Sequence, residues 1–467
     1  MLLFSTHITP RLSYIVDFIG HELFDDHTPI TITTDAGAFA AAAGPRINYS
    51  HHDIPGCFTL RPAATPAAPP ISANPRTELS LLSSTAPSHI APASLLFESG
   101  IHPIEIECFP FNDQKAFFPT EGDFPFDIFA AAFYLLSRYE EYLHHNKDEY
   151  GRYAHTGSLA WREGFLDQPL INIWLKEFKT ALSLYYPNLA FRYPVFKFMP
   201  TYDIDSAYSY LDKGWWRNTG AALKAVAAGR WAQVKERIGV LQSRTGDPFD
   251  IYEWLDSLHL YCRMRPYYFF LAAARRKGVD RNTPRSGSGL QDLVRYHSIG
   301  SRLGIHPSWQ SGDRESLLKD EIEWMEKVSG QKIIRSRQHY IRFTLPATYR
   351  RLLQCGIRQD FSMGYGTVNG FRASVASSFY WYDLEKEEKT ALRLFPFCFM
   401  DANAYYEQRQ TAAKAMGELL LYYHRIKKVG GLMITIWHNS ILGSDAEFVG
   451  WKKVYETFLK EEVYWDV

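Results

Sequence analysis

The sequence predicts an α/β protein whose second half contains a parallel β-sheet or a barrel. From Val195 onward, short apolar segments alternate with longer amphipathic segments, which is the pattern of strands followed by helices. Residues 266–271 are apolar without interruption, as expected for a strand that is buried on both faces. Ionisable residues directly follow several of these strands, and in β/α barrels that end of the sheet carries the chemistry.

The elements of the second half can be assigned in order from these patterns. A first strand begins at Val195 and ends on two carboxylates, Asp203 and Asp205. Further strands are expected at residues 266–271, 298–305, 332–334, 357–361, 392–400 and 432–437. Helices are expected within 213–247 and at 249–262, 287–294, 313–328, 346–355, 406–429 and 445–459.

The first 190 residues give a weaker pattern and predict a separate, smaller α+β domain of unknown role. Helices are expected around residues 14–24, 125–143 and 171–182, with short strands between them. Residues 61–93 are rich in Ala, Pro and Ser and predict a loose surface segment. This half contains no dinucleotide fingerprint, P-loop or nucleophile elbow, so the chemistry is expected in a second domain at residues 195–467.

Composition excludes several classes of protein. The chain has 467 residues with 51 basic and 51 acidic side chains, which gives no support for a nucleic-acid or polybasic membrane partner. Its five cysteines are dispersed and predict reduced thiols in place of a disulfide framework or a zinc knuckle. We find neither a signal peptide nor an apolar run of about 18 residues, so a cytoplasmic protein without a transmembrane segment is expected.

Asp203 and Asp205 are the first candidates for function. Residues i and i+2 of a strand point to the same face, so the two carboxylates project together from one strand end. Two like charges at close range usually bind a metal ion or share acid–base chemistry. The structural alternative is that Asp203 caps a turn while Asp205 faces solvent.

The other strand ends favour the functional interpretation. Asp, His or Arg side chains follow five of the predicted strands, whereas chance would scatter such groups over loops and helix surfaces. Besides the first pair, these residues are His306, Arg337, His339, Asp360 and His438.

With these residues in view, the segment from about 195 to 467 resembles the polysaccharide deacetylases of the NodB-homology type, which are carbohydrate esterases. The resemblance is carried by five short motifs in the family's order, at residues 201–205, 304–308, 337–340, 360–372 and 434–438. The first 190 residues look like the unassigned N-terminal domain that precedes such barrels in some bacterial homologues.

The resemblance implies a distorted (β/α)7 barrel and removal of an N-acetyl group from a sugar by a metal-activated water. A divalent metal, expected to be Zn²⁺, would be held by Asp205 and His306. Asp203 matches the general base and His438 the general acid. Arg337 would orient Asp203, and Asp360 would support His438.

One position departs from the family's pattern. The second motif usually has another histidine four residues after the first, and here that residue is Gln310. An amide oxygen is a poor zinc ligand. His339 is the best substitute as the third ligand, with a hydrogen-bonded supporting role as the alternative.

Substrate contacts are also expected near the motifs. Tyr202 and Trp309 could stack on sugar rings, although aromatic residues more often serve as packing. Arg372 could bind an anionic substrate group or form a structural ion pair.

Three functions remain open at the level of sequence. The first is a carbohydrate N-deacetylase acting on a lipid-linked or nucleotide-linked glycan precursor. The second, suggested by Gln310, is a non-catalytic barrel that binds carbohydrate or a protein partner. The third is another barrel hydrolase, such as a glycosidase using Asp203 with Asp360. The sequence leaves the sugar, the metal and the oligomeric state undetermined.

Overall fold

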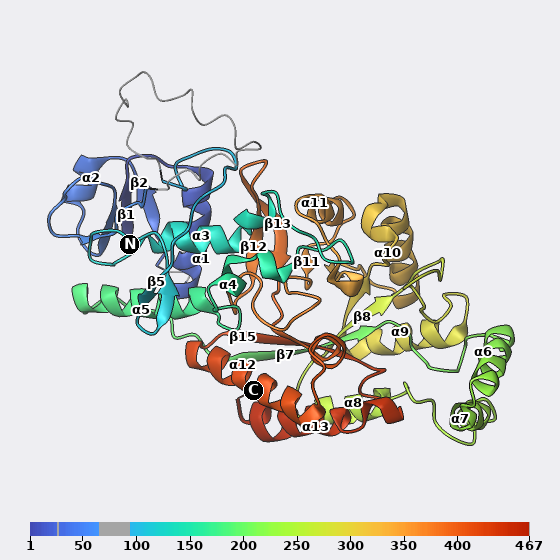
Figure 1. The fold of residues 1–467 in the computed structure, drawn as a ribbon. Helices are drawn as coiled ribbons and strands as arrows, with labels where there is room; N and C mark the ends of the chain where they lie inside the picture. The colour runs from blue at the N-terminus through green and yellow to red at the C-terminus, as the bar shows by residue number, and fades with distance from the viewer. Residues whose placement is uncertain (26–27, 65–93, 467) are drawn as a thin grey trace, which may run out of the picture. The chain divides into compact units, whose positions relative to one another are not determined.

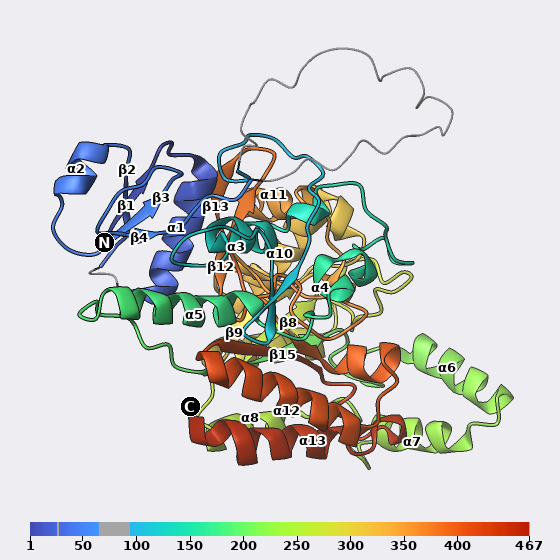
Figure 2. The same cartoon turned by 60° about the vertical axis from the view of Figure 1, so that its left-hand side comes forward.

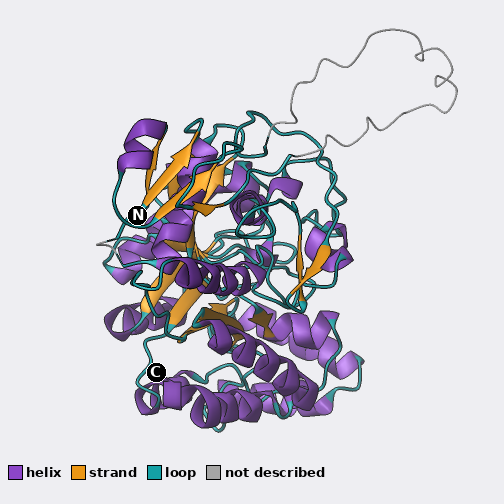
Figure 3. Cartoon of the chain, turned by 90° about the vertical axis from the view of Figure 1, so that its left-hand side faces the viewer, coloured by secondary structure: helices purple, strands orange, loops and turns teal. Residues whose placement is uncertain are grey.

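The computed structural model describes residues 1–25, 28–64 and 94–466 of the chain. These residues form two compact units. The first unit contains residues 1–145, 173–193 and 382–389, and the second contains residues 146–172, 194–381 and 390–467. Most of the predicted loose segment, residues 61–93, lies outside the described residues, which leave out 65–93. Both units combine helices with strands (Figure 3).

The first unit is built on a four-stranded sheet in the order β2-β1-β3-β4. Its pairings are all parallel, whereas residues 109–111 and 114–116 of the same unit form an antiparallel pair, so the α+β class of this domain stays a prediction. The first two connections each contain a helix, whereas residues 50–57 join the third strand to the fourth without one. The elements are β1 (Leu2–Ser5), α1 (Pro10–Leu23), β2 (Thr31–Thr33), α2 (Ala36–Ala41), β3 (Arg46–Tyr49) and β4 (Phe58–Thr59).

The remaining elements of this part of the chain are the antiparallel pair β5 (Phe109–Phe111) and β6 (Gln114–Ala116), and helices α3 (Ile128–Leu136) and α5 (Leu170–Tyr185). Every residue of α3 is buried. The predicted helix 125–143 is shorter in the structure because Arg138 adopts a left-handed backbone, with φ of 55°, which ends the α-helix.

The larger sheet has the order β12-β13-β11-β10-β9-β8-β7-β15-β14 (Figure 1), and its strands from β11 to β14 in this order lie in the second unit. The pairings from β13 to β14 are parallel, and β7 pairs along its length with β15 and β8. The strands are β7 (Lys197–Ile204), β8 (Tyr267–Leu271), β9 (Arg302–His306), β10 (Arg335–Ser336), β11 (Gln359–Asp360), β12 (Phe379–Asp383), β13 (Glu388–Leu394), β14 (Phe399–Met400) and β15 (Leu432–His438).

The expected parallel sheet is therefore present, whereas closure into a barrel is not confirmed. The strand order ends at β12 on one side and at β14 on the other, and no hydrogen-bonded pair joins these ends within residues 1–25, 28–64 and 94–466. The protein has a mixed α/β fold with a parallel central sheet.

The helices that lie between strands of this sheet in the chain are α6 (Trp215–Ala227), α7 (Trp231–Leu241), α8 (Tyr252–Tyr261), α9 (Ser288–Gly300), α10 (Glu315–Ser329), α11 (Ala347–Gln354) and α12 (Ala412–Val429). Helix α4 (Leu159–Arg162) precedes the first strand, and α13 (Trp451–Thr457) follows the last. Helices α12 and α13 run side by side (Figures 1 and 2). Among the described residues, no helix has both the length and the apolar character that crossing a bilayer requires.

The prediction of a single strand at residues 392–400 is wrong. The structure splits it into β13 and β14, which lie in different parts of the sheet, next to β11 and β15 respectively. Pro396 stands between the two strands and has no N–H to donate, so it interrupts the strand. The split places the residue after Met400 at the same sheet edge as the end of β15.

Candidate functional site

A cavity of about 450 Å³ lies at the carboxyl ends of the strands of the second unit. Five ionisable side chains that follow or end strands line it together: Asp203, Asp205, His306, His339 and His438. The strand ends that stand out in the sequence therefore meet in one place, as parallel strands require.

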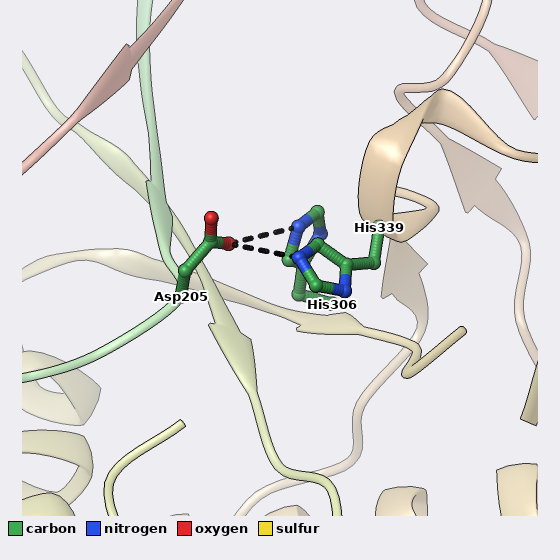
Figure 4. Close-up of side chains that lie close together, drawn as sticks. All are labelled: Asp205, His306 and His339. Carbon is green, nitrogen blue, oxygen red and sulfur yellow. Dashed lines mark ion pairs between the residues drawn. The ribbon is translucent and has the colours of Figure 1, made fainter. Parts of the chain in front are cut away.

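Asp205, His306 and His339 form the tightest group in this cavity (Figure 4). Oδ1 of Asp205 lies 3.3 Å from Nε2 of His306 and 3.7 Å from Nε2 of His339. One ligand atom from each residue lies within 4.8 Å of the other two, a spacing that could hold a metal ion.

Both imidazoles are held by their other ring nitrogen. Nδ1 of His306 lies 2.6 Å from the backbone oxygen of Arg337, and Nδ1 of His339 lies 3.0 Å from Oδ1 of Asp280. When Nδ1 donates to these acceptors, Nε2 carries the free lone pair and faces Asp205. Such outer partners orient metal-binding histidines and set their tautomer.

The donor set fits a divalent metal. Oδ1 of Asp205 is buried and accepts no well-formed hydrogen bond from the described residues, although it faces two imidazole nitrogens. Burial would raise the pKa of Asp205, but His339, His306 and His438 outweigh it and hold that pKa well below its ordinary value. One carboxylate and two imidazoles are ligands that zinc and similar ions prefer.

His339 belongs to the group of three, whereas Gln310 does not. Nε2 of Gln310 donates to the backbone oxygen of Arg275 at 3.2 Å and lies 3.4 Å from Oδ2 of Asp280, so the amide is used outside the triad. Burial would lower the pKa of His339, but Asp205 and Asp280 raise it to about 9. Metal binding at His339 would therefore have to displace a proton.

Asp203 has a different partner from Asp205. Oδ1 of Asp203 accepts a hydrogen bond from Nη1 of Arg337 at 2.8 Å, inside the protein. Arg337 also donates to Oγ1 of Thr201 at 2.8 Å and to the backbone oxygen of Phe361 at 3.1 Å. These three contacts fix the guanidinium, and through it they fix the orientation of the Asp203 carboxylate.

His438 is held by Asp401. The backbone N–H of His438 donates to Oδ2 of Asp401 at 2.7 Å, and ring Nδ1 lies 2.6 Å from Oδ1 of the same carboxylate. Nε2 of His438 consequently points into the cavity, 4.0 Å from Oδ2 of Asp205. Burial would lower the pKa of His438, but the adjacent Asp401 outweighs it and raises the pKa to about 10.

The prediction that Asp360 supports His438 is wrong. Asp360 accepts hydrogen bonds from Oγ of Ser336 at 2.7 Å and from the backbone N–H and Oγ of Ser362 at 2.9 and 3.0 Å. The reason is the strand order: β14, which precedes Asp401, pairs with β15, whereas four strands separate β11 from β15. Asp360 is a buried structural carboxylate whose pKa burial raises to about 6.

The predicted substrate contacts are wrong for Tyr202 and Arg372, which lie outside the cavity. Side chains alternate along a strand, so Tyr202 points away from Asp203, and its hydroxyl lies 2.6 Å from Nε2 of His259 on α8. Arg372 is buried, donates to the backbone oxygen of Gly364 at 3.0 Å, and lies over the ring of Phe343.

Trp309 is also not among the side chains that line the cavity. Its backbone N–H donates to Asp280 at 2.9 Å, and its ring packs under the guanidinium of Arg342 at 4.5 Å. The ring contacts Tyr340 with centroids 5.8 Å apart, and Tyr340 does line the cavity, together with Tyr150. Trp309 thus supports the wall of the cavity from behind.

Two residues of the site, Asp280 and Asp401, are absent from the sequence-based set. Asp401 directly follows the segment predicted as a strand at 392–400, so the rule that selected the other strand ends would also have selected it. Asp280 lies nine residues after the end of β8, in a loop rich in Arg and Lys. Only the folded loop brings it to His339, and no local pattern marks it.

Comparison with known proteins gives a family match for the first part of the chain. Residues 1–187 match a protein family whose description is "Family of unknown function (DUF7033)". No curated protein matches the sequence. The match covers less than half of the chain and lies outside the residues that form the cavity's ionisable cluster.

Similar solved structures cover a little more than half of the chain. They include a "putative polysaccharide deacetylase from Mycobacterium smegmatis" (14% identity, 57% of this chain, 84% of that chain, TM-score 0.37). A polysaccharide deacetylase from Bacillus cereus (10%, 58%, 89%, 0.29) and Puue allantoinase (11%, 57%, 84%, 0.35) are also similar. With TM-scores below 0.5, these similarities do not indicate a function. The side chains of the site are the basis for assigning one.

Proposed function

We propose that this protein is a metal-dependent hydrolase that removes N-acetyl groups from a sugar unit of a glycan or glycan precursor. We also propose that the parallel strands form part of a distorted (β/α)7 barrel. One observation carries the functional proposal: the cavity contains a possible metal triad, an arginine-held carboxylate and a carboxylate-held histidine. Hydrolysis of an amide by a metal-activated water uses these three components.

Asp205, His306 and His339 would hold the metal. A divalent ion there, expected to be Zn²⁺, would polarise an amide carbonyl and lower the pKa of water. His306 and His339 contribute Nε2 because their Nδ1 atoms are engaged elsewhere. The protein therefore presents its ligands already oriented toward the cavity.

Asp203 is the residue that would take a proton from the attacking water. Its Oδ1 is engaged by Arg337, and its Oδ2 lies 3.9 Å from Nε2 of His306, on the side of the metal triad. A general base must reach its proton within hydrogen-bond distance or through one water, and Oδ2 is the oxygen placed to do so. The guanidinium of Arg337 stabilises the ionised carboxylate in the protein interior.

His438 is the residue that would deliver a proton to the leaving amine. Its Nδ1 is fixed by Asp401, so the proton that it can transfer is carried on Nε2, which faces the cavity. With a pKa raised to about 10, the imidazole is protonated at neutral pH and can act as an acid. The base and the acid are thus two separate residues that line the same cavity.

The cavity has suitable walls for a sugar. A volume of about 450 Å³ is in the range of sites that bind small molecules. Tyr150, Tyr340 and Tyr406 line it and offer ring faces and hydroxyl groups. Arg152, which is held by Asp148, adds a fixed hydrogen-bond donor to the wall.

The alternative hydrolase with Asp203 and Asp360 as its carboxylate pair lacks support. Asp360 is fully buried, accepts three hydrogen bonds from serines and is not part of the cavity wall. The non-catalytic alternative was motivated by Gln310. The position of His339 beside Asp205 and His306 supports the enzyme over that alternative.

Replacing Asp203 with Asn tests the proposal by separating catalysis from metal binding. Asn keeps the shape of the side chain and cannot accept a proton as a base, whereas the three proposed metal ligands remain. We expect acetate release from an N-acetylated oligosaccharide to fall by at least about 100-fold, the lower range for loss of a general base. Metal content measured on the same sample should be unchanged. Full activity of the variant would refute the assignment of the base.

A further inference from the structure

The connection from β7 to α8, residues 205–251, contains a helical hairpin that adds nothing to the sheet. Helices α6 and α7 pack on each other and lie at the edge of the second unit, beyond the sheet (Figures 1 and 2). Because β7 ends at Ile204, the hairpin departs from the sheet edge that carries the candidate site. We refer to residues 213–244 as the α6–α7 hairpin.

The hairpin exposes an unusual amount of apolar surface. Trp215, Trp216 and Trp231 are 63%, 73% and 65% exposed, and Leu223 is 65% exposed. On α6, Trp215, Trp216, Leu223 and Val226 lie within roughly 100° of one another around the helix axis, on one side. Ile238 and Leu241 of α7 are also exposed. Exposed apolar surface concentrated in this way marks a binding surface.

The same segment is strongly basic, although the chain as a whole is balanced. It contains seven Lys and Arg residues and one acidic residue, Glu236, whereas the whole chain has a formal net charge of zero. Glu236 accepts a hydrogen bond from the hydroxyl of Tyr210 at 2.7 Å, so it is turned toward the base of the hairpin. The basic residues are Lys213, Arg217, Lys224, Arg230, Lys235, Arg237 and Arg244.

Buried polar contacts hold the base of the hairpin. Asp247 accepts hydrogen bonds from the backbone N–H groups of three consecutive residues, 209–211. Arg237 of α7 donates to Oδ1 of Asn218 on α6 at 2.8 Å, and Asn218 donates to the backbone oxygen of Tyr210 at 2.9 Å. The exposed tryptophans are therefore presented on an anchored element and not on a loose loop.

A tryptophan-rich apolar side combined with Lys and Arg is the pattern of helices that lie in a membrane interface. Indole rings favour the headgroup level of a bilayer, and anionic lipids attract each nearby basic residue. The cores of protein–protein interfaces are instead depleted in lysine. Single-stranded nucleic acids stack on free aromatic faces, whereas the rings of Trp215 and Trp216 stack on each other, with centroids 3.6 Å apart.

We propose that the α6–α7 hairpin docks this protein onto the surface of an anionic lipid bilayer. The apolar side would enter the headgroup region, and the lysines and arginines would contact lipid phosphates. Nothing in this step requires a helix that crosses the membrane. The net charge of the whole chain gave no support for a polybasic membrane partner, whereas the charge of this segment does.

Docking also has a consequence for the substrate, which rests on the proposed function. The hairpin follows Asp205 directly in the chain and shares its sheet edge, so the cavity would be brought close to the bilayer. A sugar attached to an anionic lipid would then be the favoured substrate over a free oligosaccharide. Binding and catalysis are measured separately, so that failure of one is distinguishable from failure of the other.

Co-sedimentation of the full-length protein with vesicles tests the docking. We expect binding to vesicles of phosphatidylcholine with phosphatidylglycerol and much weaker binding to pure phosphatidylcholine. Lys224→Gln with Lys235→Gln should weaken partition by about 30-fold. The loss of one basic residue near an anionic surface weakens binding by about five- to sixfold, and the two losses multiply. Each of Trp215→Ser and Trp231→Ser should weaken it by about tenfold, corresponding to roughly 60 Å² of apolar surface.

Matched controls come from the same unit. Lys414→Gln with Lys453→Gln removes two exposed lysines from other helices, and Trp465→Ser removes a tryptophan that is 78% exposed. These variants should bind vesicles like the unmodified protein, and circular dichroism should show that all variants remain folded. Equal losses in the control and hairpin variants would overturn the proposal.

Two further outcomes would also overturn it. Absence of vesicle binding by the unmodified protein would refute docking directly. A protein that dimerises in solution, and becomes monomeric when Trp215 and Trp231 are replaced, would assign the hairpin to a self-interface. Acetate release is then compared on a lipid-borne and a free N-acetylated sugar. Release from neither sugar would refute the proposed function and leave the docking proposal standing. Equal rates on both sugars would refute only the proposed preference for a lipid-borne substrate.

Discussion

Asp401→Asn gives the sharpest test of the acid–base assignment. The carboxylate of Asp401 raises the pKa of His438 to about 10, whereas the ordinary value is 6.5 and burial alone would lower it further. The substitution replaces an anion by a neutral amide of the same shape. The pKa of His438 should then fall toward its ordinary value, because Asp401 is the group that raises it most and only Asp205 and Asp203 still raise it.

The size of the effect follows from the fraction of His438 that is protonated. With a pKa of 6.5, about one quarter of the imidazole is protonated at pH 7 and roughly 3% at pH 8. If His438 is the acid, the variant should lose up to about fourfold in kcat/KM at pH 7 and up to about 30-fold at pH 8, the full values applying when its pKa returns to the ordinary value. In the unmodified protein His438 keeps its proton over this range, so the loss of activity on the alkaline side of the pH profile (the alkaline limb) occurs at a higher pH.

The assay is acetate release measured across this pH range for the unmodified protein and two variants. Asp360→Asn is the matched control. Asp360 is another fully buried aspartate at a strand end of the same sheet, and it accepts hydrogen bonds from Ser336 and Ser362. We expect it to leave the alkaline limb in place. An Asp401→Asn profile that overlays the unmodified protein, or a shifted limb in Asp360→Asn, would refute the reasoning.

Two other predictions concern the metal ligands and the stability of the fold. His339→Ala should abolish stoichiometric zinc binding, whereas Gln310→Ala should retain it. Metal analysis after gel filtration distinguishes the two variants. The reverse pattern would assign the third ligand to Gln310. Glu321 on α10 accepts a hydrogen bond from the backbone N–H of Ser308 at 3.0 Å, and burial raises its pKa from 4.5 to about 7. The folded state therefore retains a proton that the unfolded state loses between these pH values, so Glu321 costs stability as the pH rises through 7. Glu321→Gln should raise the free energy of unfolding at pH 8 by up to about 3 kcal/mol and change it little near pH 4, as measured by denaturant titration. A gain of equal size at both pH values would contradict this explanation.

The candidate site was largely predictable because strand ends are a local property of the sequence. Asp203, Asp205, His306, His339 and His438 each follow or end an apolar segment, and a parallel sheet brings such positions to one edge. Their convergence in one cavity needs only the alternation of strands and helices. It does not require knowledge of any loop.

The wrong predictions concern residues whose partners are set by the order of the strands and the direction of the side chains in space. Asp360 and Asp401 both follow strands, and only the strand order places Asp401 next to His438. Tyr202 adjoins Asp203 in sequence but points to the opposite face, as pleating requires. Asp280 reaches His339 through a loop whose path has no simple sequence rule.

Overall averages also concealed a local feature. A net charge of zero over 467 residues argued against an anionic surface as a partner. The basic residues of the α6–α7 hairpin are balanced by acidic residues elsewhere in the chain. Charge has to be counted over the exposed element that would make the contact, because electrostatic attraction is screened over about 10 Å.

The most direct test of the central claim is acetate release from an N-acetylated oligosaccharide before chelation, after chelation and after zinc is restored. If Asp205, His306 and His339 hold a metal that the hydrolysis requires, activity should disappear with the metal and return with it. Metal content of the same samples should follow the activity. Acetate release that persists in metal-free protein, or that is absent from protein with a full complement of zinc, would contradict the account.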